Sequence, residues 1–364
     1  MKKKILKVTI ILSMLLLTLI PMSVNAATSG TFGNNLNWVL DSNGTLTISG
    51  TGAMPDWNGG RETPWSSFGS NDSKIKKVII SDGITSIGNS AFENFRNLET
   101  ITLNDDIESI GNYAFNNCYG LKMTRVVLPY SLTSIGKYAF FGCNISIIDI
   151  PSTVTSIGTN AFAYCENLEE LRADGNSYYS SLNGNLYNGN QTKLIQYVED
   201  DTTFTIPNSV TTIGEWAFYN YNNSLTTITI PETVTKIESS AFYKCSQLKE
   251  VIYGGTKAQW DKITISDSNT PLTNATIHYT LPSTKTTFED NQFIVTPKSV
   301  PNGSNIIFAC YNGNKMVYVN PYIYAGETTI PFSTTETYDK VKVMIWENLE
   351  TCVPLCEAED VPLN

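Results

Sequence analysis

One short motif returns at nearly regular intervals along the middle of the chain: Ser-Ile-Gly-x-x-Ala-Phe. It occurs four times between residues 86 and 162, and its glycines are spaced 23, 25 and 22 residues apart. After a gap of 56 residues it returns as Thr212–Phe218 and then, with Glu238 in place of the glycine, as Lys236–Phe242. A unit of about 23 residues cannot bury its apolar face alone, so neighbouring units must stack to create a core. The repeat therefore predicts a solenoid.

A second pattern between the motifs predicts what each unit contains. An apolar residue, two variable residues and then apolar-x-apolar recur, as in Leu98-x-x-Ile101-x-Leu103. Such alternation is typical of a short strand with one face buried. Proline ends several of these strands, because it cannot donate to a parallel ladder; these prolines are Pro129, Pro151 and Pro231. We expect each unit to hold one short parallel strand, a proline turn, an Ile-Gly corner and an Ala-Phe segment that closes the opposite side.

Four of the seven cysteines recur at the same position of the repeat unit. Cys118, Cys143, Cys165 and Cys245 each stand three residues after the repeat phenylalanine, where Phe95 and Tyr221 occupy the same position in other units. A position that accepts Cys, Phe or Tyr is typical of a buried ladder, so we expect these thiols to act as small apolar side chains. Zinc or iron–sulfur binding would need clustered C-x-x-C spacing, which is absent from the sequence.

Residues 166–203 depart from the period and predict an irregular insertion with a hairpin. Glu199-Asp200-Asp201 lies at its edge. A calcium loop would need the D-x-D-x-D-G pattern, so a solvated loop is favoured. The last strand-like unit contains His278, the only histidine, which we interpret as a capping side chain. We expect no metal and no cofactor.

The first 26 residues have the pattern of a secretory signal peptide. Four lysines precede an apolar run from Ile10 to Ile20, and Val24-Asn25-Ala26 supplies a small-residue cleavage site. Their removal takes away four lysines and no acid, so the formal charge falls from −10 to −14. An acidic chain is unsuited to binding nucleic acid. We expect a secreted, extracellular protein that does not insert in a membrane after cleavage and that associates with the cell surface, if at all, without a visible anchor.

Two further modules flank the repeats. Residues 27–66 predict a β-hairpin cap, because Asp41-Ser42-Asn43-Gly44 separates two alternating segments. The repeats occupy 67–280, and a Pro/Ser/Thr-rich linker follows them. Short alternating segments over 281–364 predict a small immunoglobulin-like β-sandwich. The pairing of Cys310, Cys352 and Cys356 stays open.

The repeat unit, extended to Ser-Ile-Gly-x-x-Ala-Phe-x-x-Cys-x-x-Leu and followed by Ile-x-Ile-Pro-x-x-Val, resembles the BspA-type leucine-rich repeat of bacterial surface proteins. The hairpin before the repeats resembles the segment that often precedes such arrays, and the stretch that ends at His278-Tyr279 resembles their usual end. The segment Val341–Glu357 resembles a C-terminal module of secreted proteins from Gram-positive anaerobes. The resemblance covers nearly the whole chain after residue 26. It implies adhesion or binding of a protein, such as host matrix or another surface protein, and it implies no catalytic residues.

The strand pattern identifies the residues that would face such a partner. Outward positions alternate with the buried ones, and short polar side chains there would surround an apolar centre at Val127 and Ile147. The alternative is that threonine simply suits an exposed strand. The predicted binding residues are Thr100, Thr102, Arg125, Val127, Ile147, Asp149, Glu170, Arg172, Thr227 and Thr229.

Carbohydrate binding and catalysis are the two alternatives to protein binding, and the sequence supports each of them less well. A carbohydrate could stack on Trp38, Trp57 or Trp65 of the cap, or bind the terminal sandwich, although tryptophans that close the open end of a core are the simpler interpretation. An enzyme would need buried titratable pairs in a pocket, and short solenoid turns offer little room for one. We therefore predict a protein without catalytic residues.

Overall fold

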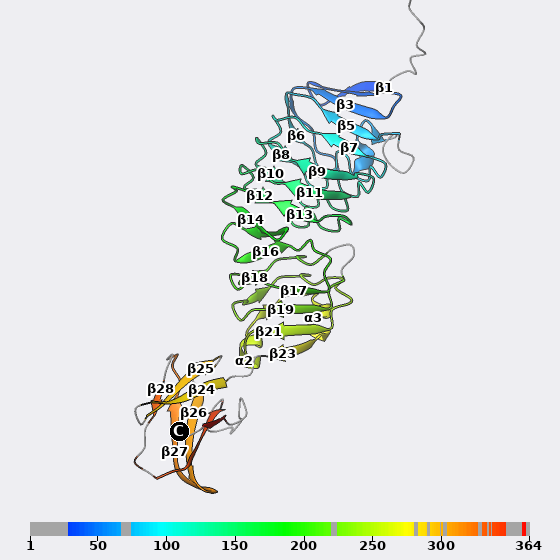
Figure 1. The fold of residues 1–364 in the computed structure, drawn as a ribbon. Helices are drawn as coiled ribbons and strands as arrows, with labels where there is room; N and C mark the ends of the chain where they lie inside the picture. The colour runs from blue at the N-terminus through cyan, green and yellow to red at the C-terminus, as the bar shows by residue number, and fades with distance from the viewer. Residues whose placement is uncertain are drawn as a thin grey trace, which may run out of the picture.

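The computed structural model describes residues 28–66, 74–219 and 224–279, and then 283–289, 292–298, 300, 304–326, 330–332, 335, 337–346 and 359–361. The predicted signal peptide, residues 1–26, lies outside the described residues, as do Cys352 and Cys356. The described residues between 28 and 279 form an elongated stack of short strands (Figure 1). This is a parallel β-solenoid, as the repeat predicted.

The stack begins with an antiparallel sheet of β1 (Thr28–Phe32), β2 (Leu36–Leu40) and β3 (Thr45–Gly50). Asp41 makes the turn between β2 and β3, because its carboxylate accepts hydrogen bonds from the backbone N–H groups of Asn43 and Thr45, at 2.9 and 2.7 Å. β3 then pairs in parallel with β5 (Lys77–Ile80), which joins this sheet to the solenoid. The 3₁₀ helix η1 (Gly60–Glu62) lies between them in the chain.

Two rows of short parallel strands run along the solenoid, each divided into more than one sheet, and we call these rows face A and face B. Face A continues from β5 through β7 (Thr100–Thr102), β9 (Met123–Val127), β11 (Ile145–Asp149) and β13 (Glu170–Arg172). Face B consists of β4 (Gly52–Ala53), β6 (Ile84–Ile87), β8 (Ser109–Ile110), β10 (Ser134–Ile135) and β12 (Ser156–Ile157). The expectation of one strand per unit was therefore incomplete: the Ser-Ile corner forms a second short strand, because successive corners lie in register and hydrogen-bond to one another.

The inserted segment separates this first half of the solenoid from a second half. β14 (Tyr179–Leu182) and β15 (Asn185–Asn188) form an antiparallel hairpin. Face B resumes beside it with β16 (Lys193–Gln196), β18 (Thr212–Ile213), β20 (Lys236–Ile237) and β22 (Thr264–Ile265). Face A resumes with β17 (Thr203–Thr205), β19 (Thr227–Ile230), β21 (Glu250–Tyr253) and β23 (Thr276–Tyr279). Two short helices, α2 (Lys257–Trp260) and α3 (Thr270–Asn274), lie in the last units.

The repeat phenylalanines form the predicted ladder inside the stack. The ring of Phe115 stacks on those of Phe92 and Phe140, with centroids 5.3 Å apart in both cases, and Phe218 stacks on Phe242 at 4.7 Å. The four ladder cysteines are buried, as predicted, and no disulfide joins them to one another. Each thiol lies near the carbonyl of the phenylalanine one unit back; Cys118 Sγ is 3.2 Å from the Phe92 oxygen. Burial raises the pKa of Cys165 to about 12, so this thiol stays protonated.

The described part of the C-terminal region is all-β, as predicted. β24 (Ser283–Glu289), β25 (Gln292–Lys298) and β28 (Ile330–Phe332) form one antiparallel sheet. β26 (Asn305–Asn312), β27 (Lys315–Ile323), β29 (Lys340–Trp346) and β30 (Glu359–Val361) form the other. Cys310 is buried in β26 together with Ile306 and Phe308. The pairing of Cys310 with Cys352 or Cys356 stays open.

Candidate binding surface

The predicted binding residues all lie on face A, but the insertion divides them. Thr100 and Thr102 in β7 and Arg125 and Val127 in β9 are exposed, and the other predicted residues are half-buried. β9, β11 and β13 pair directly, so six of the ten residues form one continuous group: Arg125, Val127, Ile147, Asp149, Glu170 and Arg172. Thr227 and Thr229 belong to the second half of face A.

Two ion pairs organise this group of six, which we call the β9–β13 patch. The Arg125 guanidinium binds both carboxylate oxygens of Asp149, with Nη2 3.0 Å from Oδ1. Arg172 Nη2 donates to Glu170 Oε2 at 2.6 Å. The hydrogen bond from Arg172 holds the pKa of Glu170 below its ordinary value. The two-pronged Arg125–Asp149 pair fixes the relative orientation of these two side chains, whereas Arg172 and Glu170 share one hydrogen bond.

A shallow hollow lies at the end of the patch. It encloses about 220 Å³ and is lined by both arginines, Asp149, Val127 and, from the following turns, Tyr130 and Asp174. Val127 is 57% exposed and Tyr130 73% exposed, so the hollow has an apolar rim beside its charges. Tyr130 and Asp174 were not predicted as binding residues. Tyr130 follows Pro129, and the position after the strand-ending proline is the sequence signal that could have identified it.

The second half of face A has a different surface. Thr227 and Thr229 lie beside Thr203 and Thr205 of β17 on one side, and beside Glu250 and Ile252 of β21 on the other. His278 in β23 contacts the Glu250 carboxylate through Nε2. It therefore lies on the exposed strand surface paired with an acid, rather than over the end of the core as the capping interpretation expected.

The cap tryptophans are part of the core. Trp65 is fully buried, stacks on Phe92 at 5.7 Å and donates its indole N–H to the Ala91 carbonyl at 3.0 Å. Trp38 is buried as well, and Trp57 packs half-buried against Trp65 at 5.5 Å. Rings held in this way do not offer a free face for a sugar, so the cap does not support the carbohydrate alternative.

A strip of surface aromatic rings follows the Ala-Phe side of the solenoid, and the sequence reasoning missed it. Tyr113 stacks on Tyr138 at 5.0 Å and Phe141 on Tyr164 at 5.4 Å, and Tyr164 in turn stacks on Tyr219 at 5.4 Å. The stacked rings cover part of one another's faces, and Tyr219 is buried among them. The signal was available, because aromatic residues recur directly before Ala-Phe and one or two positions after it.

The fold and its motif define a class: a bacterial leucine-rich-repeat solenoid. The family model described as "BspA type Leucine rich repeat region" matches in six copies, over residues 66–169 and 196–299. These matches cover more than half of the chain, which therefore belongs to the BspA-type leucine-rich-repeat family. The resemblance predicted from the repeat motif is confirmed.

The chain is also similar to solved structures. A leucine-rich repeat protein from Eubacterium ventriosum is 27% identical, with a TM-score of 0.53 over 70% of this chain and 78% of that one. A leucine-rich cell surface protein from Faecalibacterium prausnitzii is 21% identical, with a TM-score of 0.34, over 66% of this chain and 98% of that one. The pneumococcal vaccine antigen PcpA is 18% identical, with a TM-score of 0.40, over 62% and 69%. No curated protein sequence matches the chain.

Among the residues that the structure describes, no helix is both long and apolar enough to cross a membrane.

Proposed function

We propose that this protein is a secreted, non-catalytic binding protein that recognises a protein partner through the β9–β13 patch of face A. The observation that carries the proposal is the combination of exposed Val127 and Tyr130 with the Arg125–Asp149 ion pair and Arg172 around one hollow. An apolar centre with a polar rim is the usual composition of a protein interface. Arginine and tyrosine are also the residue types that most often dominate binding energy.

Membership of the family supports this function, because BspA-type proteins are typically non-catalytic binding proteins. A leucine-rich-repeat solenoid gives an extended surface whose side chains are fixed by the stack, and such surfaces are suited to protein–protein contact. The acidic charge, with 34 Asp and Glu against 24 Lys and Arg, makes nucleic acid an unsuitable partner. An extracellular location and a matrix or surface-protein partner are parts of this proposal.

The test is capture of the protein, purified after export, by a panel of immobilised extracellular-matrix and bacterial surface proteins. Val127→Asp places a charge in the centre of the patch, and we expect it to weaken capture at least about tenfold, which corresponds to about 1.4 kcal/mol. Ile252→Asp is the matched control, because Ile252 is an outward, 46% exposed strand residue in the second half of face A. Equal capture by the parent and both variants would contradict the proposal, as would an equal loss in both.

A further inference from the structure

The insertion leaves a break in face B between β12 and the hairpin β14–β15, and we call this break the seam. β12 pairs with β10 on one side, and its other side has no strand partner in the described residues. The next sheet starts with β14, which pairs only with β15. The buried apolar residues also divide here into two clusters, one mainly before the insertion and one after it. The seam is therefore where regular stacking stops.

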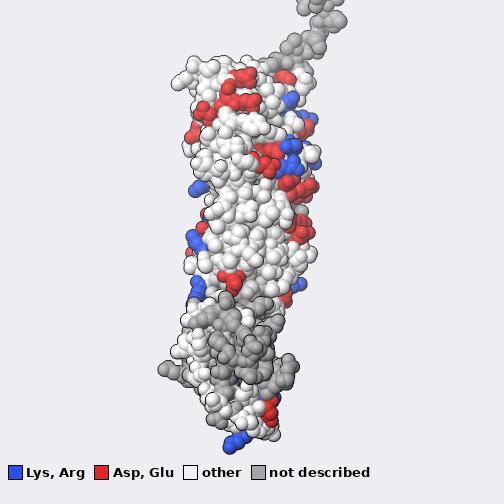
Figure 2. All heavy atoms as spheres, turned by 60° about the vertical axis from the view of Figure 1, so that its left-hand side comes forward, with Lys and Arg blue, Asp and Glu red and all other residues white. Residues whose placement is uncertain are grey.

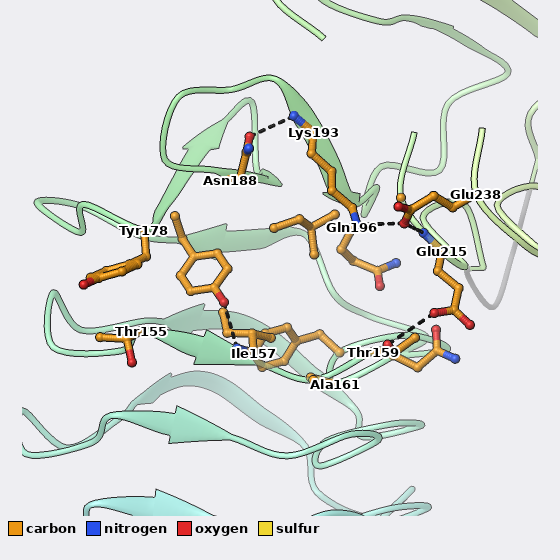
Figure 3. Close-up of a pocket in the computed structure, with 16 residues that line it drawn as sticks. Thr155, Ile157, Thr159, Ala161, Tyr178, Asn188, Lys193, Gln196, Glu215 and Glu238 are labelled. Atoms are coloured by element: carbon orange, nitrogen blue, oxygen red, sulfur yellow. Dashed lines mark hydrogen bonds and ion pairs between the residues drawn. The ribbon is translucent and has the colours of Figure 1, made fainter. Parts of the chain in front are cut away.

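A pocket of about 330 Å³ lies at the seam. Figure 3 shows Thr155 and Tyr178 at one end of it, Thr159 and Glu215 at the other, and Gln196 between them. Its size is within the range of small-molecule sites. Tyr178 is 56% exposed, so its ring is accessible. The pocket brings residues from units far apart in the chain to one place, as a specific ligand site requires.

One buried side chain in the pocket lacks partners. Asn160 is 6% exposed, and neither its amide nitrogen nor its amide oxygen makes a hydrogen bond. A buried polar group without a partner is destabilising by about 1–3 kcal/mol, so such groups normally have one. Both atoms have almost no accessible surface, so a molecule in the pocket that both donates and accepts hydrogen bonds satisfies them only after the Asn160 side chain turns toward it.

The charged groups around the pocket limit which kinds of molecule it can bind. The Glu238 carboxylate is already satisfied: it accepts from Lys193 Nζ at 2.7 Å, Lys236 Nζ at 3.1 Å and the backbone N–H of Glu215 at 3.0 Å. Burial acts to raise the pKa of Glu238, but these hydrogen bonds outweigh it and leave the pKa below its ordinary value. The carboxylate of Glu215 is exposed and lies 3.5 Å from Thr159 Oγ1, so it can accept further hydrogen bonds.

This combination favours a neutral, hydroxyl-rich ligand over the charged alternatives. Lys193 is already paired with Glu238, and the exposed Glu215 carboxylate disfavours a phosphate or another anion. An ammonium group could bind Glu215, but it can only donate and would leave the Asn160 nitrogen unpaired. Figure 2, which brings face B forward, shows a broad and mostly uncharged strip along this side of the rod, flanked by charged side chains at its edges. Hydroxyl groups donate and accept, and the carbon face of a sugar ring packs on aromatic rings.

We propose that the seam pocket binds a neutral sugar residue, with the Asn160 amide and the Glu215 carboxylate bonded to its hydroxyl groups and the Tyr178 ring against its apolar face.

The test uses the protein purified after export and the methyl glycosides of glucose, galactose, mannose and N-acetylglucosamine, with binding detected by saturation-transfer NMR. We expect signal from at least one glycoside and a loss of affinity of about tenfold or more in Asn160→Gly. Glycine suits this position, because Asn160 has φ of 60°, which glycine adopts without strain. Asn94→Gly is the control for replacing an asparagine of positive φ by glycine, since Asn94 has φ of 65° and lies outside the pocket.

Three results would overturn the proposal. Absence of signal from all four glycosides would mean that the pocket holds water only. Glycoside binding that persists in both Asn160→Gly and Glu215→Gln would place the sugar site elsewhere. Binding of N-acetyl-lysine amide in preference to the glycosides would assign the pocket to a cationic side chain. Val127→Asp should leave glycoside binding unchanged, which separates this outcome from that of the protein-binding proposal.

Discussion

The regular units and the seam satisfy their backbone polar groups in different ways. At the face B corners of regular units, backbone bonds to backbone: Gly136 N–H donates to the Ile110 carbonyl and Gly158 N–H to the Ile135 carbonyl, both at 2.8 Å. At the seam, a side chain supplies the acceptor instead: the hydroxyl oxygen of Tyr179 accepts from the Ile157 N–H at 2.8 Å.

The difference explains why a pocket forms at one place in the stack. Backbone pairing holds adjacent units at the spacing of a β-sheet, which leaves no room between them. Side chains are longer and hold the hairpin away from β12, so a polar space remains between the two. At the seam, a cavity therefore replaces the tight packing between regular units. Substitutions in the regular units and at the seam should differ in their effects on the stability of the protein.

The largest effect should come from the phenylalanine ladder. Phe140 is fully buried between Phe115 and Phe162, and Phe140→Ala should lower the free energy of unfolding by about 3–5 kcal/mol. Phe162 lines the seam pocket, so water can enter the space left by Phe162→Ala, and we expect a loss about 1 kcal/mol smaller. Urea denaturation measures both. A larger loss in Phe162→Ala would show that the seam is packed as tightly as the regular units.

A smaller effect should come from the hydrogen bond that joins β12 to the hairpin. Tyr179→Phe removes the acceptor for the Ile157 N–H and should destabilise the protein by about 1–2 kcal/mol. Tyr178→Phe removes the same atom from a largely exposed neighbour and is the matched control, with little expected change. Thermal unfolding of the two variants tests this, and equal melting temperatures would show that water replaces the hydroxyl at the seam.

The regular units could be predicted from sequence, because each copy of the repeat motif shows which of its residues lie at equivalent positions in neighbouring units. Each Ser-Ile-Gly-x-x-Ala-Phe motif fixes where Phe115 and Phe140 lie, and Cys118 and Cys143 then follow at constant spacing. The outward strand residues could be identified in the same way, since side chains alternate along a strand. The second strand at each Ser-Ile corner was missed, because two residues are too few to show alternation.

The seam could not be predicted, because its contacts join segments with no common period. Tyr179 and Ile157 are 22 residues apart, but Thr159 and Glu215 are 56 apart and meet only because the hairpin fills the interval. Asn160 occupies a position that holds Ser90 and Ser240 in other units, so nothing in its local sequence marks it as a site. Its proposed role in binding depends on the seam, where β12 has no strand partner on the side of the hairpin β14–β15 in the described residues.

The smallest expected effect concerns Glu199, at the edge of the inserted segment. Its carboxylate is half-buried and accepts from Asn185 Nδ2 at 2.9 Å; burial raises the pKa of Glu199, and this hydrogen bond only partly opposes the rise. A raised pKa means that the folded state favours the neutral form, so stability is lost as the pH rises from the ordinary pKa of a glutamate through the pKa of Glu199 in the folded protein.

Glu199→Gln keeps an acceptor for Asn185 and removes the charge. It should stabilise the protein at pH 7 by about a few tenths of a kcal/mol, because solvent screens this partly exposed group, and should have no effect near pH 3. Melting temperatures at the two pH values measure this, with the exposed Glu166→Gln as the control; a destabilised Glu199→Gln at pH 7 would show that the charge itself stabilises the hairpin.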